Sequence, residues 1–169
     1  MIHLKTNPKG IDIPIQSAQQ SVYDKLISAY SCDVTAYGRV YTDVNNESIK
    51  PYAYINGGEY KEVLHDDKIN GIHFFFVEDD TSEIVSRSCL SNNDVDIIFI
   101  VDDLTKVNGD IIHYQDEEIK ENVKSSLRGF FEVKSVTKGK EALNGFDVSQ
   151  LKFIYPYFVF KITVTINNY

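Results

Sequence analysis

The sequence contains only two cysteines, Cys32 and Cys89, which stand apart without a CxxC spacing or a matching set of histidines. Disulfide frameworks and zinc sites need several such residues at short, defined spacings, so neither role is expected for this pair. Two reduced thiols in a cytosolic protein are the favoured interpretation. A buried free cysteine behaves as a small hydrophobe.

Long apolar runs are also missing. No window approaches the roughly 18 apolar residues that a membrane span requires. Residues 1–10 have neither the apolar core nor the cleavage site of a signal peptide. Glycine and proline number only 9 and 4, and no segment is repeated or low in complexity. With 169 residues and an apolar fraction of 43%, the chain is predicted to form one acidic α+β domain over residues 1–169.

Positive charge is scarce as well. Lysine and arginine total 17 against 25 acidic residues, which gives a formal charge of −8, and the basic residues are spread along the chain. Neutralising nucleic-acid phosphates requires clustered positive charge, so a nucleic-acid grip of the usual kind is not expected. An acidic surface could still face DNA in order to repel it.

Two segments have the period of an amphipathic helix. After Pro14, which suits the first turn of a helix, apolar side chains recur every three or four residues as far as Tyr30. The second helix is predicted over residues 115–128, where acids precede the apolar stripe and bases follow it, as the helix macrodipole favours. Gly129 is expected to end it.

Several segments instead alternate with period two. Asn56-Gly57-Gly58 between two aromatic runs predicts a tight β-hairpin, because these residues tolerate positive φ angles. The polar stretch 78–94 is interpreted as a loop or an extended hairpin arm, with a possible strand at 83–87. The apolar run 95–101 predicts a central strand buried on both faces. Further strands are expected at 37–41, 72–77 and 130–136.

The clearest alternation runs from Tyr157 to Ile166. Its apolar face, from Phe158 to Ile166, is expected to lie on the core, and its other face, with Lys161, Thr163 and Thr165, is expected to be free. Two helices and about six mostly antiparallel strands make the predicted architecture a two-layer α+β sandwich with both helices packed on one face.

A metal or catalytic cluster could form at His65-Asp66-Asp67. The pair Asp94 and Asp96, or the pair Asp102 and Asp103, could add carboxylates for a magnesium-dependent nuclease. The spacing matches no recognised metal motif, and acids are common throughout the chain. Solvated turn residues are therefore the favoured interpretation.

Other signs of chemistry are weak. His3, His73 and His113 are scattered, and no serine sits in a nucleophile elbow. Gly57 and Gly58 open a strand rather than a helix, so they are interpreted as a turn and not as a phosphate cradle. No catalytic, metal or cofactor site is predicted. The eleven tyrosines and ten phenylalanines fit either core packing or a subunit interface.

Taken in order, the residues resemble a family of short proteins encoded with the structural genes of tailed phages and prophages of Bacteroides-type bacteria. The matching segments are the Ile-x-Ile-x-Ile run at 11–15, Tyr37-Gly-Arg-Val-Tyr41, Pro51 and Tyr54, Gly58-Glu-Tyr-Lys61, Val63-Leu-x-Asp-Asp67, Phe74-Phe75, the apolar run 95–101, the acids 116–118 and Tyr155-Pro-Tyr-x-x-Phe160. They cover most of the chain, and none encodes chemistry.

The resemblance implies a non-enzymatic tail-terminator or neck-ring subunit, like the terminators of siphophages and the ring proteins of crAss-like phages. It implies a ring of six subunits, or a multiple of six, in the virion neck or tail, assembled in the host cytoplasm. The expected partners are copies of the chain, portal, connector or tail-tube proteins, and packaged DNA sliding through an acidic lumen. Residues 78–94 and 138–150 are the expected contacts between rings.

Two alternatives stay open. One is a metal-dependent hydrolase that uses His65, Asp66 and Asp67. The other is a non-enzymatic adaptor domain that binds a partner strand along an exposed sheet edge.

Overall fold

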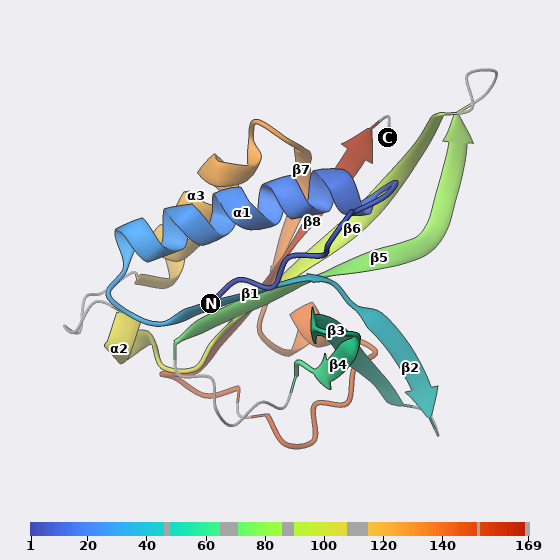
Figure 1. Ribbon diagram of the computed structural model, residues 1–169. Helices are drawn as coiled ribbons and strands as arrows, with labels where there is room; N and C mark the ends of the chain where they lie inside the picture. The colour runs from blue at the N-terminus through green and yellow to red at the C-terminus, as the bar shows by residue number, and fades with distance from the viewer. Residues whose placement is uncertain (46–47, 65–70, 86–89, 108–114, 152, 168–169) are drawn as a thin grey trace.

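The computed structural model describes residues 1–45, 48–64, 71–85, 90–107, 115–151 and 153–167, and Figure 1 shows two main helices above a long sheet with a smaller sheet below it. In chain order the elements are α1 (Asp12–Ala29), β1 (Val34–Arg39), β2 (Tyr41–Asn45), β3 (Ser48–Asn56), β4 (Glu59–Glu62), β5 (Ile72–Val85), β6 (Leu90–Val101), α2 (Leu104–Val107), α3 (Gln115–Leu127), β7 (Glu132–Lys138), the 3-10 helix η1 (Gly139–Leu143) and β8 (Phe158–Asn167). No helix among the described residues is long and apolar enough to cross a membrane.

The main sheet has five strands in the order β1-β5-β6-β8-β7. Only the β1–β5 pair is parallel, and the other three pairs are antiparallel. The three-stranded small sheet, in the order β2-β3-β4, lies in the connection from β1 to β5. The predicted α+β class with a mostly antiparallel sheet is confirmed, although the strands divide into two sheets rather than one.

Both main helices cover one face of the main sheet, as predicted. The stripe of α1, including Ala18, Val22 and Leu26, is fully buried, and so are Ile119 and Val123 of α3. Beneath them, three phenylalanine rings lie side by side across β5, β6 and β8: Phe74 is 5.1 Å from Phe99, and Phe99 is 4.7 Å from Phe160 between ring centroids. These stacked rings and the two helical stripes form the larger of the two hydrophobic cores.

The smaller core lies on the opposite face. Ile98 and Ile100 of β6 are buried there against Ala53 of the small sheet and Leu143 of η1. The central strand is therefore buried on both faces over residues 97–101, as its apolar run predicted, whereas Asp96 of the same run is half-buried. Segment 138–150, which is also the expected contact between rings, contributes η1 to this core.

The tight hairpin is confirmed at Gly57 and Gly58. Asn56 pairs with Glu59 across them, and both glycines have positive φ, 59° and 89°. Positive φ at both central positions gives the turn a twist that matches the flanking strands.

The last strand departs from its prediction on one face. Phe160, Ile162, Val164 and Ile166 are buried beneath the helices as expected. Val159, predicted on the wet side, is also buried, because the smaller core covers this end of the strand. The expectation that the other face is free was wrong there, because alternation along one strand carries no sign of a second layer.

The polar stretch 78–94 forms the extended hairpin arm that was one of its two interpretations. β5 continues to Val85 and β6 begins at Leu90, and Ser82 to Val85 pair with Asn93 to Leu90. Figure 1 shows this arm projecting beyond the helices and the rest of the sheet. The strand foreseen at 83–87 is thus the end of a longer one, and residues 86–87 lie outside the described ranges.

The start of β5 requires glycine at position 71. Gly71 has a φ of 123°, and a Cβ built there would stand 2.2 Å from the backbone oxygen of Asp33. The same oxygen accepts a hydrogen bond from Ile72 N at 2.9 Å, so the backbone cannot easily retreat. Gly71 therefore permits a close backbone approach between β5 and the segment before β1.

Replacing Gly71 by alanine is expected to lower the free energy of unfolding by about 3 kcal/mol, through the combined cost of positive φ and the backbone clash. Urea unfolding followed by circular dichroism measures it. Gly129→Ala is the matched control, because a Cβ there meets nothing within 4 Å. Equal effects from the two substitutions would contradict this account of Gly71.

Candidate functional site

Four tyrosines lie on the outer face of the small sheet, and we call them the tyrosine face: Tyr41, Tyr52, Tyr54 and Tyr60. Register places Tyr41 opposite Tyr52 and Tyr54 opposite Tyr60. Ala53, between the two tyrosines of β3, is fully buried, so its neighbours point outward. Tyr41 and Tyr60 expose 48% and 51% of their surface.

The rings of the tyrosine face contact one another. Tyr60 packs edge-to-face against Tyr41 at 5.5 Å and against Tyr54 at 5.9 Å between ring centroids. Two cations lie over Tyr41, with Lys5 Nζ at 5.4 Å and Arg39 Cζ at 5.8 Å from the centroid. Edge-to-face pairs and cation–π contacts hold such rings in place, so the face is ordered before any partner arrives.

Beside the tyrosine face, five polar residues join the N-terminal segment, α1, β1, β5 and β6. We call this group the Arg39 node, and it contains Lys5, Asp12, Arg39, Glu78 and Asn93. Arg39 Nε donates to Asp12 Oδ1 at 2.9 Å, and another guanidinium nitrogen donates to Glu78. Lys5 Nζ donates to Asp12 Oδ2 at 3.0 Å, and Asn93 Nδ2 donates to Glu78 Oε1 at 2.9 Å. The node fixes the base of the β5–β6 arm to the rest of the fold.

The Asp12 carboxyl is held in its charged form. Burial, the largest single influence, would raise its pKa, but the hydrogen bonds from Arg39 and Lys5 together outweigh burial. The pKa therefore lies below its ordinary value of 3.8. Its place in the first turn of α1 adds the favourable helix dipole.

Asp94 and Asp96, considered as magnesium ligands, are engaged by other groups. Both lie on the half of the main sheet that the small sheet does not cover. Asp94 accepts from Lys134 Nζ at 2.8 Å and from Thr165 Oγ1 at 2.9 Å. The hydrogen bond from Lys134 lowers the pKa of Asp94.

Asp96 is bound in the same way. It accepts from Lys161 Nζ at 2.8 Å and from Thr163 Oγ1 at 2.7 Å. The polar side chains of β8 are therefore occupied by cross-strand partners, and the prediction that this face is free needs correction here too. Cross-strand ion pairs and hydroxyl bonds are a usual means of stabilising a solvated sheet face.

The other candidate residues do not converge. Asp103 accepts from the backbone N and the hydroxyl of Thr105, and so begins α2. Asp102 lies near Tyr157, whose pKa is raised by burial first and by that carboxylate second. Cys32 is half-buried, and burial raises the pKa of its thiol.

The histidines stay apart as well. His3 stacks on Tyr37 at 5.0 Å, whereas His73 is buried within β5. His113, Cys89 and the His65-Asp66-Asp67 cluster lie outside the described residues. In the described ranges, no group of three or more His, Cys, Asp or Glu side chains is placed to hold a metal ion.

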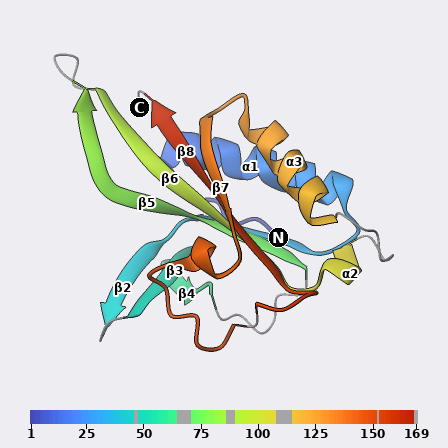
Figure 2. The same cartoon turned by 180° about the vertical axis from the view of Figure 1, so that it is seen from behind.

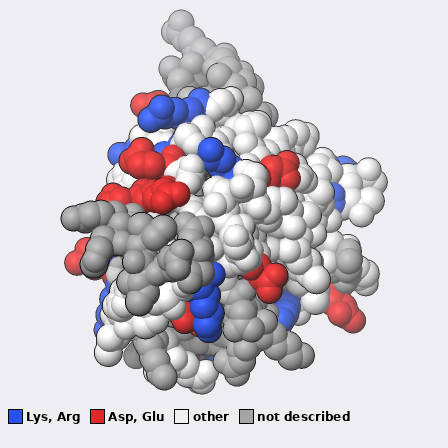
Figure 3. All heavy atoms as spheres, turned by 90° about the vertical axis from the view of Figure 1, so that its left-hand side faces the viewer, with Lys and Arg blue, Asp and Glu red and all other residues white. Residues whose placement is uncertain are grey.

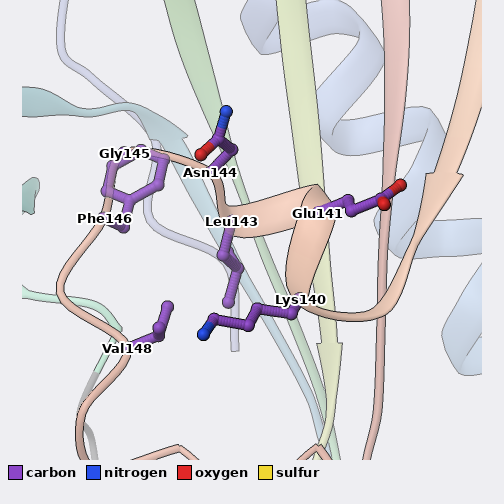
Figure 4. Close-up of a pocket in the computed structure, with 7 residues that line it drawn as sticks. All are labelled: Lys140, Glu141, Leu143, Asn144, Gly145, Phe146 and Val148. Atoms are coloured by element: carbon purple, nitrogen blue, oxygen red, sulfur yellow. The ribbon is translucent and has the colours of Figure 1, made fainter.

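One open hollow of about 770 Å³ lies beside η1. Figure 4 shows Lys140, Leu143 and Val148 extending toward a common space, while Glu141 and Asn144 point away from it. Its walls come from residues that also cover the smaller core, such as Leu143 and Phe146. The hollow is thus a groove between η1 and the segment that follows it, with one cation near its apolar wall.

The helical end of the molecule carries charges of both signs side by side, as Figure 3 shows. On α3, Glu121 pairs with Lys124, and Glu117 pairs with Lys138 of β7 at 2.6 Å. These pairs break up the acidic character of α3. The net charge of −8 is therefore not gathered into one acidic patch at this end.

The chain matches no family model, no curated protein and no solved structure.

The tyrosine face was only partly foreseen. The aromatic residues of the β segments fitted both core packing and an interface, and the structure divides them between the two. Phe74, Phe75 and Tyr37 are buried, whereas Tyr41 and Tyr60 are exposed. The hairpin register set by Gly57 and Gly58 could have placed Tyr54 opposite Tyr60, but Tyr41 joins them only through the pairing of β2 with β3.

Removing the charge of Asp12 should expose the contribution of the Arg39 node. Asp12→Asn is expected to lower the free energy of unfolding by about 1–3 kcal/mol at pH 7. Because the folded pKa lies below 3.8, the carboxylate stabilises the fold above that pH and loses this effect as pH falls through the folded pKa. The difference between wild type and variant should be constant from pH 7 to about 5 and shrink below about 4.

Urea titrations at several pH values measure this difference. Asp24→Asn is the control on the same helix, since the Asp24 carboxylate accepts an exposed hydrogen bond from the Gln20 amide and lies outside the Arg39 node. A difference for Asp12→Asn that stays unchanged down to pH 2 would rule out the ionised carboxylate as its source.

Proposed function

We propose that this chain is a non-enzymatic, ring-forming structural subunit of a tailed phage, in the head-to-tail connector or the tail terminator. The observation that carries the proposal is the tyrosine face, a preordered aromatic surface on which Tyr41 and Tyr60 remain about half exposed. Tyrosine is enriched at protein interfaces, because its ring buries a large area at low entropy cost while its hydroxyl stays hydrogen-bonded.

Three segments of the resemblance to phage neck and terminator proteins contribute to this surface. Three of the four tyrosines, Tyr41, Tyr54 and Tyr60, belong to these segments. The segments are Tyr37-Gly-Arg-Val-Tyr41, Pro51 with Tyr54, and Gly58-Glu-Tyr-Lys61. The first of these segments also contains Arg39, which packs over Tyr41 and bonds Asp12 in the Arg39 node. These segments contain no predicted catalytic or metal-binding residues, yet they contribute exposed side chains, which fits a role in assembly.

In this proposal the tyrosine face contacts the neighbouring protein of the particle, either portal, connector or tail tube. The arm of β5 and β6 projects to one side of the fold, and its sequence from Glu78 to Glu83 is rich in acids. Such an arm could line or approach a channel through which DNA slides without sticking, since acidic surfaces repel phosphate.

Particle composition and the state of the purified chain test this proposal together. Mass spectrometry of purified virions should detect the chain, and native mass spectrometry with negative-stain microscopy should show closed rings. A strictly monomeric chain that is absent from particles would overturn it.

The tyrosine face gives a sharper prediction. In particles whose genome encodes Tyr41→Ser with Tyr60→Ser, the amount of this chain retained after purification should fall about tenfold or more, because truncating a buried interface tyrosine commonly costs over 1 kcal/mol. Quantitative mass spectrometry of the particles measures it, and circular dichroism checks that the fold is kept.

Tyr155→Ser is the matched control, since Tyr155 is 64% exposed but lies outside the tyrosine face. Full retention of the double variant would exclude the tyrosine face as the contact with the neighbouring protein.

A further inference from the structure

The two sides of the main sheet end differently. On one side, β1 is closed by the N-terminal segment: His3 N donates to Ala36 O, and Ala36 N donates to Met1 O, each at 2.9 Å. On the other side, β7 pairs with β8 alone among the described strands. β7 therefore presents an open row of backbone donors and acceptors from Glu132 to Lys138.

A second open edge lies on the arm. β1 pairs with β5 only as far as Phe76, where β1 ends at Arg39. Beyond Phe76, Val77 and Glu78 pair with β6, and after a register shift Ser82 to Val85 pair with it again. No described strand pairs with this part of β5 on its other side. Figure 2 shows β5 and β7 on opposite sides of the sheet, with β6 and β8 between them.

These two edges are complementary in length and charge. β7 spans 7 residues, and the open part of β5 covers residues 77–85, with a register shift between Glu78 and Ser82. The open part of β5 carries Glu78, Asp79, Asp80 and Glu83 in its sequence. β7 carries Lys134 and Lys138, whose side chains are 48% and 50% exposed while they pair with acids of their own chain. Each ammonium group has three donors and can serve a second carboxylate.

We propose that copies of this chain join head to tail, with β7 of one copy pairing along the open edge of the β5 arm of the next. This inference rests on the proposed ring function and names the contact that closes the ring. Because the two edges are different surfaces, the contact is heterologous, and repeating it generates a ring when the rotation closes. The tyrosine face takes no part in this contact and remains available to the neighbouring protein.

Paired proline substitutions test each edge. Neighbouring residues of a strand point their N–H groups to opposite sides, so one of Val136→Pro and Thr137→Pro removes a donor from the outer edge of β7 and leaves its ladder with β8 intact. Glu83→Pro and Ile84→Pro do the same for the arm. In each pair, the variant with the higher melting temperature is the edge variant, because the other variant also loses a hydrogen bond of its own ladder.

Mixing the edge variants distinguishes this contact from others. Alone, each edge variant should be a monomer in native mass spectrometry, whereas wild type forms rings. Mixed at equal amounts, the two should form a dimer and nothing larger, because one intact β7 edge meets one intact arm edge. Rings that persist in either edge variant, or a mixture that stays monomeric, would overturn the inference while leaving the ring function standing.

Hydrogen exchange on the wild type needs no variant. Amides of residues 77–85 and 132–138 should gain protection together as protein concentration rises and rings form. Unchanged protection in either segment would overturn the inference, and so would a purified chain that stays monomeric, whereas its absence from particles bears on the proposed function alone.

Discussion

The structure depends on the burial of β6 on both faces. Toward the helices, Val95, Ile97 and Phe99 are fully buried. On the opposite face the strand changes character halfway, from Asp94 and Asp96 to Ile98 and Ile100. The small sheet and η1 cover the apolar half and remove it from water. Lysines of β7 and β8 pair with the aspartates of the acidic half. One strand thus sets both the extra layer and the solvated face of the sheet.

The Arg39 node solves a related problem where the arm leaves the sheet. Beyond Phe76, β5 loses its partner on one side, and a lone two-stranded hairpin is marginally stable in water. Arg39 bridges Asp12 of α1 and Glu78 of β5, so the base of the arm is tied to a helix at the point where strand pairing ends. Because Arg39 also lies over Tyr41, the same side chain supports the arm and the tyrosine face.

Local sequence patterns predicted the helices and strands, whereas pairing between distant segments determined how these elements pack together. The stripe of α1, the Asn56-Gly57-Gly58 turn and the apolar run 95–101 depend on neighbours within a few residues, so the sequence predicted them correctly. The burial of Val159 and the engagement of Lys161 with Asp96 depend on partners 60 or more residues away or on a second sheet, and alternation along one strand carries no sign of these. The tyrosine face could not be predicted from the sequence for the same reason, because it forms only when three strands pair in register.

The edge of β7 has features that usually prevent association as well as those that permit it. Its register shifts between Val133 and Ser135, and lysines stand along it, which are two devices by which natural sheets discourage unspecific pairing. An acidic strand meets these lysines favourably, at about 0.2–1 kcal/mol for each cross-strand pair, whereas a neutral or basic strand gains nothing or is repelled. In the proposed contact, lysines on β7 select the acidic sequence of the arm as the partner edge, and the N-terminal segment on β1 removes a competing edge. A sheet protected in this way can pair in one direction only, which is what an assembly made of a single kind of subunit requires if it is to close instead of aggregating.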